Sequence, residues 1–328
     1  MKKRVINLSS QAPLLNIVSY GRGFHPLTPV QRSQITRTVR GFPEVVVKVS
    51  GGARSVAGVD QHVGYIGRDG ELELETDMGE RARGRQAHRQ VIAGWLLSVD
   101  ALPRQTTRRP PVRKPPKLVH NLIFSMPPGT PSEKVLNAVQ RLALNEWQLK
   151  HRYAMALHTD DHHPHVHVVL KAISEEGERL NIKKATLRSW RSQFAANLRE
   201  LGVAANATER AVRGQTKTRK RDSIYRAAQR GMSTHMRARW SQAFRSLPET
   251  APVEQPGGEK LRRTRREVLE GWRQVAANLR ANGDHEVVDQ IKIFLGGMSP
   301  PLTELERFAE RLRVKVVEKR TREIDRTR

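Results

Sequence analysis

Histidines with the spacing of metal ligands gather in one short segment, which runs His158-Thr-Asp-Asp-His-His-Pro-His-Val-His167. Apolar runs of strand length flank its loop, at residues 152–158 and 165–172, so we predict an antiparallel hairpin with a six-residue loop. Side chains alternate along a strand, so His165 and His167 share a face, and His158 comes beside them from the partner strand. Val166 and Val168 face the opposite side.

Three neutral imidazoles with open coordination positions suit a catalytic divalent metal that also binds phosphate oxygens. The chain has no cysteine, which excludes disulfides and thiolate sites. We expect the ligands at the sheet edge, with Asp160 orienting a ligand histidine or binding the ion itself. The alternative is a solvated histidine-rich loop that binds transition metals adventitiously. The third histidine, the two apolar strands and the basic chain together favour a functional site.

Other periodic segments must position this hairpin. Residues 118–126 predict a strand, and residues 132–150 and 183–202 predict helices with apolar residues in register. Upstream lie a possible strand at 44–50, a short helix at 59–70 that stops at Gly-Arg-Asp-Gly, a helix from 85, and a Pro-rich stretch at 103–117. This order predicts an α+β fold in which helices pack on an antiparallel, palm-like sheet.

The chain divides into four predicted parts. We expect a basic, partly disordered segment at 1–50, a main domain at 51–247 that carries the histidine hairpin, a linker at 248–258 and a helical module at 259–328. In the module, a helix ends at Asn282-Gly283, and Thr303 with Glu306 predicts a capping box before another helix. No chemistry can be read from the sequence of this module.

The net charge of +26 and the pI of about 11.2 restrict the class of partner. Basic runs occur throughout the chain, so a polyanion such as DNA is the natural partner, because binding releases its counterions. A membrane surface is the alternative, but no basic amphipathic segment is evident at either end. No run approaches the roughly 20 apolar residues of a membrane span, and the N-terminal stretch is a poor signal peptide. We therefore expect no membrane insertion and a cytoplasmic location.

The histidine segment resembles the signature of the conjugative and mobilisation relaxases of the HUH endonuclease superfamily, whose mark is His165-Val-His167 followed by apolar residues. The resemblance extends over roughly residues 55–230, so it implies that the domain at 51–247 is a relaxase nuclease domain. It implies a Mg²⁺- or Mn²⁺-dependent enzyme that nicks one strand of plasmid origin DNA and begins conjugation or mobilisation. It also implies a 5′-phosphotyrosine intermediate, a free 3′-OH, and export of the protein with the strand.

The resemblance points to Tyr65, which occupies the family's nucleophile position, in Asp-Gln-His-Val-Gly-Tyr65-Ile-Gly-Arg-Asp-Gly. The chain has only four tyrosines. Tyr153 lies an odd number of residues from His158 on one strand, so it points away from the metal face. Tyr20 lies in a weakly patterned region, and Tyr225 lies in a probable basic helix with a packing or phosphate-binding role. The alternative for Tyr65 is that it only packs its small helix.

The remaining roles stay open at this stage. Asp60 and Asp160 are candidate bases that would take the proton of the Tyr65 hydroxyl. Arg68 or the metal can supply a positive charge beside this hydroxyl. His163 positions a phosphate or a leaving oxygen, or it shapes the loop. The predicted DNA contacts are Arg68, Arg213, Lys217, Arg219, Lys220 and Arg221. No nucleotide-binding Gly-x-x-x-x-Gly-Lys-Ser/Thr motif is present, so unwinding and export are expected to need accessory transfer proteins and a type IV secretion coupling protein.

Two other functions remain as alternatives. A rolling-circle replication initiator shares the metal and tyrosine chemistry, but it typically carries its tyrosine after the histidines, whereas Tyr65 precedes them. A noncatalytic basic DNA-binding accessory protein would hold a metal structurally. A closed metal site without metal-dependent nicking would favour this second alternative.

Overall fold

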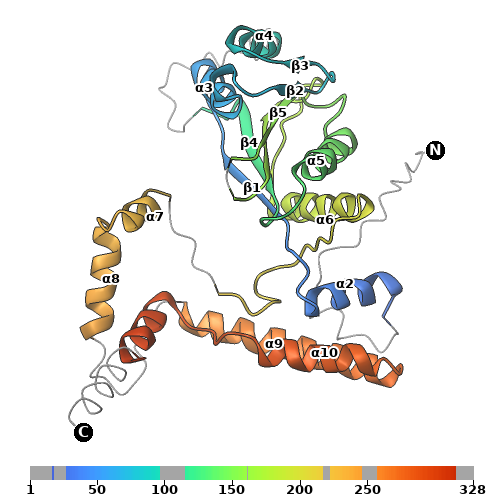
Figure 1. Ribbon diagram of the computed structural model, residues 1–328, viewed down its shortest axis with the longest axis vertical. Helices are drawn as coiled ribbons and strands as arrows, with labels where there is room; N and C mark the ends of the chain where they lie inside the picture. The colour runs from blue at the N-terminus through green and yellow to red at the C-terminus, as the bar shows by residue number, and fades with distance from the viewer. Residues whose placement is uncertain are drawn as a thin grey trace, which may run out of the picture. The chain divides into compact units, whose positions relative to one another are not determined.

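The computed structural model describes residue 17 and residues 27–96, 115–160, 162–216, 222–245 and 257–314. Within these ranges, contacts divide the chain into two units (Figure 1). One unit spans Gly41–Ala207, and the other joins residues 27–40 to the chain from Thr208 onward. Some predicted features lie outside the described residues: Tyr20, Lys217, Arg219, Lys220, Arg221, most of the Pro-rich stretch and most of the 248–258 linker.

The first unit is built on one antiparallel sheet, which confirms the α+β prediction. Its strands are β1 (Val46–Gly51), β2 (Leu74–Thr76), β3 (Arg81–Ala82), β4 (Val119–Ser125), β5 (Tyr153–His158) and β6 (His165–Lys171). They lie in the order β1-β4-β6-β5-β2-β3, and every neighbouring pair is antiparallel. The histidine hairpin is therefore β5–β6, as predicted, and its two strands are interior strands of the sheet.

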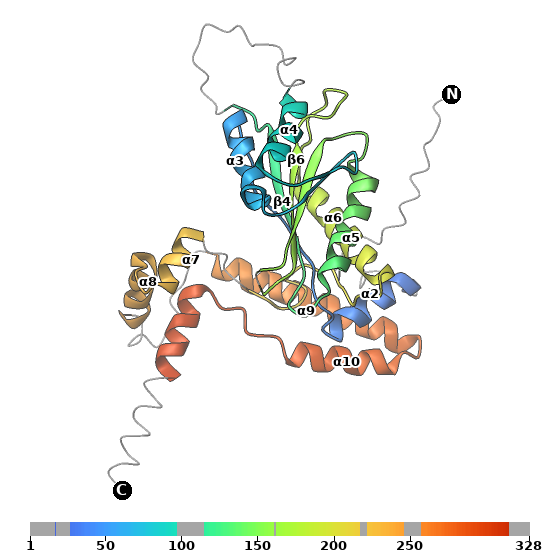
Figure 2. The same cartoon turned by 45° about the horizontal axis from the view of Figure 1, so that its top comes forward.

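One face of the sheet is covered by α5 (Ser132–Glu146) and α6 (Lys184–Glu200) (Figure 2). Val166 and Val168 point to this face and are buried with Phe124, Trp147 and Phe194. The Phe124 and Phe194 rings meet edge to face, with centroids 5.4 Å apart. This burial is what fixes the strand parity: it holds the even-numbered residues of β6 in the core, so the odd-numbered histidines face the other way.

The opposite face is covered by α3 (Val56–Ile66) and α4 (Arg85–Leu96). Val59, Val63 and Ile66 recur at helical spacing on α3 and are buried with Val169 of β6. Ser55 caps the start of this helix by accepting a hydrogen bond from the Gly58 amide. The helix is thus fixed over the strand that carries His165 and His167.

Some elements differ from the sequence predictions. The helix expected at 132–150 ends at Glu146, and Leu149 adopts a left-handed backbone with φ of 62°. Helix α2 (Pro29–Val39) lies in the segment that showed only weak patterning. Strands β2 and β3 were not predicted, because a strand of two or three residues carries no readable alternation.

The second unit is helical in its described residues. Helices α2, α9 (Gly258–Ala281) and α10 (His285–Gly296) share a core with Ile35, Trp272 and Val288. Helices α7 (Asp222–Gln229) and α8 (Thr234–Arg245) come next in the sequence, and α8 packs on the helical residues 304–314. The Thr303–Glu306 capping box is present, as predicted. None of the described helices is long and apolar enough to cross a membrane.

Candidate metal centre and its tyrosine

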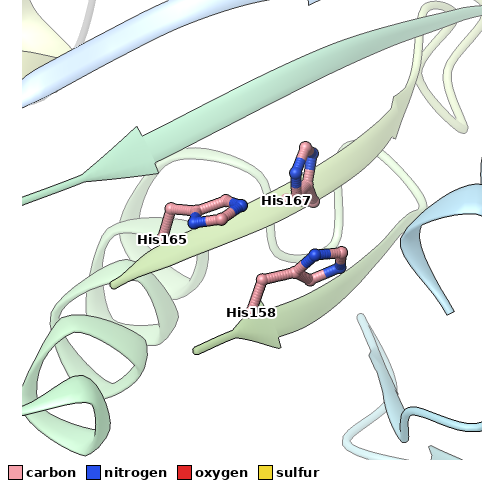
Figure 3. A group of neighbouring side chains, drawn as sticks. All are labelled: His158, His165 and His167. Carbon is pink, nitrogen blue, oxygen red and sulfur yellow. The ribbon is translucent and has the colours of Figure 1, made fainter. Parts of the chain in front are cut away.

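Three imidazoles meet at the hairpin end of β5 and β6 (Figure 3). The ring centroid of His158 lies 4.5 Å from that of His167 and 5.2 Å from that of His165, and the last two are 4.9 Å apart. One ligand atom from each residue lies within 4.8 Å of the others. The convergence predicted from strand parity is thus present. The expected place at the sheet edge is wrong, because both strands are interior.

Backbone carbonyls hold two of these rings. The Nε2 atom of His158 donates to the carbonyl oxygen of Ile66 at 2.7 Å, and the Nδ1 atom of His165 donates to that of His163 at 2.9 Å. Each bond leaves the other ring nitrogen as a lone-pair donor. Metal-binding histidines commonly have such a partner, which fixes the tautomer and the ring orientation. The donor set therefore fits a divalent metal.

Burial favours the neutral form of two of the imidazoles, those of His158 and His167. Burial and the neighbouring His158 and His165 lower the pKa of His167 to about 3. Burial is also the main cause that lowers the pKa of His158. A neutral imidazole is the form that binds a metal, so these histidines need not lose a proton at neutral pH.

Tyr65 projects from α3 beside the cluster. Its ring lies edge-on to that of His167, with centroids 5.6 Å apart and an interplanar angle of 87°. Although its ring makes this contact, Tyr65 remains 67% exposed. Its hydroxyl forms no hydrogen bond with any residue that the structure describes. The other described tyrosines are placed differently: Tyr153 is buried on the opposite face and Tyr225 lies on α7.

The segment after Tyr65 is conformationally strained. Arg68 and Asp69 both have left-handed backbones, with φ of 46° and 52°, at a cost of about 1–2 kcal/mol each. The Arg68 guanidinium forms an ion pair with Asp160 in the β5–β6 loop. This hydrogen bond is the main cause that lowers the pKa of Asp160. The ion pair links the tyrosine-bearing segment to the loop between the ligand strands.

Gly67 lies where α3 and α4 approach closely. A Cβ atom at this position would lie 2.2 Å from Cε1 of the buried His88 ring. We predict that Gly67→Ala destabilises the protein by about 1–3 kcal/mol, because the ring has to move. Thermal unfolding measures this effect. Gly64→Ala on the same helix is the control: it meets only the exposed Asp69 carboxylate and should leave the melting temperature unchanged or raised. An equal loss of stability in both variants would contradict the prediction.

The remaining predicted site residues are only partly gathered at the cluster. His163 has an exposed side chain, and its contact with the cluster is through its carbonyl group. Asp60 is exposed on α3 and lies five residues from Tyr65, which places it about 140° around the helix. Arg213 belongs to the other unit, where it donates hydrogen bonds to Thr208 and Gln215.

Two features near the histidine cluster were not predicted from the sequence. The Ile66 carbonyl that holds His158 comes from a residue 92 positions away, and no side-chain pattern reveals it. Lys48 lies in the same row across the sheet as Ile123 and His167. A signal for Lys48 was present, because it is the one charged residue inside the apolar run Val45-Val-Val-Lys-Val49.

Comparison with known proteins agrees with this geometry. Residues 99–203 match the family model of the relaxase, MobA/VirD2-like, nuclease domain. The match contains His158, His165 and His167, whereas Tyr65 and Arg68 precede it. Searches of curated proteins and of solved structures found no match. The matched segment carries the three-histidine cluster, so residues 99–203 resemble a MobA/VirD2-like relaxase nuclease domain, a kind of domain that nicks DNA.

Proposed function

We propose that the protein is a conjugative or mobilisation relaxase that nicks one strand of a transfer origin with Tyr65. The observation that carries the proposal is the place of Tyr65. Its exposed ring has its centroid 5.6 Å from that of His167, which is one of the three clustered histidines. A metal-binding histidine cluster alone fits a hydrolytic nuclease equally well. The adjacent tyrosine favours a covalent mechanism.

The covalent step conserves the phosphodiester bond energy. The Tyr65 hydroxyl oxygen attacks the scissile phosphorus and loses its proton to a base or to solvent. The phosphorus–O3′ bond breaks, and the departing O3′ takes up a proton to give a free 3′-OH. The 5′ phosphate remains bonded to Tyr65, so attack by a 3′-OH in the reverse direction can rejoin a strand.

The chain supplies the geometry for this step. His158, His165 and His167 would hold a Mg²⁺ or Mn²⁺ ion, which when bound polarises phosphate oxygens as a Lewis acid. The Ile66 and His163 carbonyls hold two ligand rings in place. Arg68 pairs with Asp160 and ties its loop to the tyrosine segment. Of the two candidate bases, Asp60 lies on another side of α3 from Tyr65, and Asp160 lies on the loop between β5 and β6.

The proposal also specifies the surroundings of the reaction. The substrate is single-stranded DNA of the transfer origin on a plasmid or similar element in the donor cytoplasm. Arg213 and the basic stretch that contains Lys217, Arg219, Lys220 and Arg221 are proposed DNA contacts. Accessory transfer proteins would open the origin, and a type IV secretion coupling protein would receive the protein with its strand.

An adduct assay tests the proposal. The full chain is incubated with Mn²⁺ and a single-stranded origin oligonucleotide that is labelled at one end or the other. We expect the 3′-labelled strand to migrate with the protein on a denaturing gel. The 5′-labelled product should run free and be extended by a DNA polymerase. Cleavage without an adduct would make the enzyme a hydrolase, and an adduct on the 5′-labelled fragment would reverse the polarity.

The Arg68–Asp160 pair gives a separate prediction. Arg68→Gln removes the cation that ties the β5–β6 loop to the strained segment after Tyr65, so the nicking rate should fall by about tenfold or more, as for other residues that support a metal site. Arg141→Gln is the control, because it breaks the exposed pair with Glu200 between α5 and α6. Single-turnover nicking measures both variants. Equal rates for Arg68→Gln and Arg141→Gln would show that the pair has no role in positioning.

A further inference from the structure

A lysine shares the sheet face that carries the histidine cluster. In the strand register, Lys48 of β1 pairs with Ile123 of β4, and Ile123 pairs with His167 of β6. Directly paired residues of antiparallel strands point to the same face, so Lys48 and His167 do as well. Two interstrand spacings separate their Cα atoms by about 10 Å, and the long stem of lysine spans much of this distance.

The face around Lys48 is open. Val46 is 41% exposed and Ser50 is exposed, whereas Val45 and Val47 on the opposite face of β1 are buried. Ile123 and Ser125 on β4 are half-buried. Because β1 is an edge strand of the sheet, residues on this face of β4 and β1 lead from the histidines to the edge. We call Val46, Lys48, Ser50, Ile123 and Ser125 the β1–β4 floor.

The positive charge of Lys48 has no ion-pair partner in the part of the chain that the structure describes. No carboxylate of these residues lies within ion-pair distance of its ammonium group. Arg68, a second cation near the cluster, is already paired with Asp160. The potential metal ligands are histidines without a carboxylate, so they contribute no negative charge. Lys48 is partly buried, and a phosphate from outside the protein would supply a partner for its ammonium group.

We propose that Lys48 binds a backbone phosphate of the single DNA strand on the β1 side of the scissile phosphate, with the β1–β4 floor beneath the strand. Lys48 is a positioning residue that takes no part in bond breakage. A charge-assisted hydrogen bond fixes one phosphate, and this sets which neighbouring phosphate reaches Tyr65 and the histidine cluster. This inference rests on the proposed function for the identity of the strand, but strand binding does not require cleavage.

The test measures binding of the full chain to a short, fluorescein-labelled oligothymidylate by anisotropy over a series of salt concentrations. Lys48→Gln should weaken binding about tenfold, the effect of one lost charge-assisted contact. The slope of log affinity against log salt should become shallower by about 0.7, as for one phosphate contact on a single strand. Lys48→Arg keeps the charge and should bind within about twofold of the wild type.

Lys184→Gln is the matched control, because Lys184 is exposed at the start of α6 on the opposite face of the sheet. It removes the same charge and should change neither the affinity nor the slope by a comparable amount. Calorimetric Mn²⁺ binding and thermal unfolding should be unchanged in Lys48→Gln. Wild-type binding by Lys48→Gln, or an equal loss in Lys184→Gln, would overturn the assignment. A failure of adduct formation would refute the proposed function and leave this binding result intact.

Discussion

Tyr65→Phe is expected to abolish the covalent DNA adduct and the release of a 3′-OH product. The substitution removes only the hydroxyl, which forms no hydrogen bond with any described residue, and it retains the ring that packs edge-on to His167. The metal and the DNA should therefore bind as in the wild type. Since the substitution removes the proposed nucleophile, the rate of adduct formation should fall by at least about a thousandfold, equivalent to roughly 4 kcal/mol of barrier. A denaturing gel with a labelled origin oligonucleotide measures this loss.

Two other tyrosines serve as controls for this experiment. Tyr153→Phe alters a residue that is buried on the α5–α6 face, where burial raises the pKa of the hydroxyl to about 12. Tyr225→Phe removes the exposed hydroxyl that accepts a hydrogen bond from Gln229 on α7. Both variants should form the adduct at wild-type rates. An adduct that persists in Tyr65→Phe and disappears in Tyr225→Phe would move the nucleophile to α7.

The hairpin and the convergence of its three histidines were predictable because the relevant information is local. Alternation along residues 165–172 assigns His165 and His167 to one face and Val166 and Val168 to the other, and the six-residue loop brings His158 alongside. Helix α5 was also predictable, since its Val135, Val139 and Leu142 recur at helical spacing.

The sequence could not predict which groups orient the histidine rings and their loop. The His158–Ile66 hydrogen bond and the Arg68–Asp160 ion pair each join residues 92 positions apart. Both depend on how α3 docks on the sheet. The Ile66 contact uses a backbone carbonyl, which every residue has, so side-chain chemistry does not reveal it. The sequence assigned Asp160 to the histidines, whereas in the structure its carboxylate pairs with Arg68.

Helix α2 shows a second way in which patterning fails. Its capping box, Thr28 with Gln31, is visible in the sequence, but its buried side includes the polar Gln34 and Thr38 beside Ile35. Thr38 satisfies its hydroxyl by donating to the Gln34 carbonyl, which makes this burial tolerable. A search for apolar residues at helical spacing therefore does not detect this helix. In the same way, β2 is defined by its pairing with β5 rather than by its own three residues.

His167→Ala is expected to lower the nicking rate by at least about a thousandfold, since a bound metal contributes several kcal/mol of transition-state stabilisation. His158→Ala and His165→Ala should behave alike, because all three rings converge within 4.8 Å. His162→Ala is the control, since this residue lies exposed in the β5–β6 loop and outside the converging set. Single-turnover nicking with Mn²⁺ compares the four variants with the wild type.

A second measurement separates metal loss from general damage. His167 is buried and contacts the Tyr65 ring, so His167→Ala also leaves a small cavity and can lower stability by itself. Mn²⁺ at a hundred times its dissociation constant should stabilise the wild type by about 2.7 kcal/mol and raise its melting temperature. His162→Ala should keep this increase, whereas His167→Ala should lose it at the same Mn²⁺ concentration. If the triple variant of His158, His165 and His167 nicked DNA normally in the presence of a chelator, the cluster would have no catalytic metal role and the covalent chemistry would have to proceed without one.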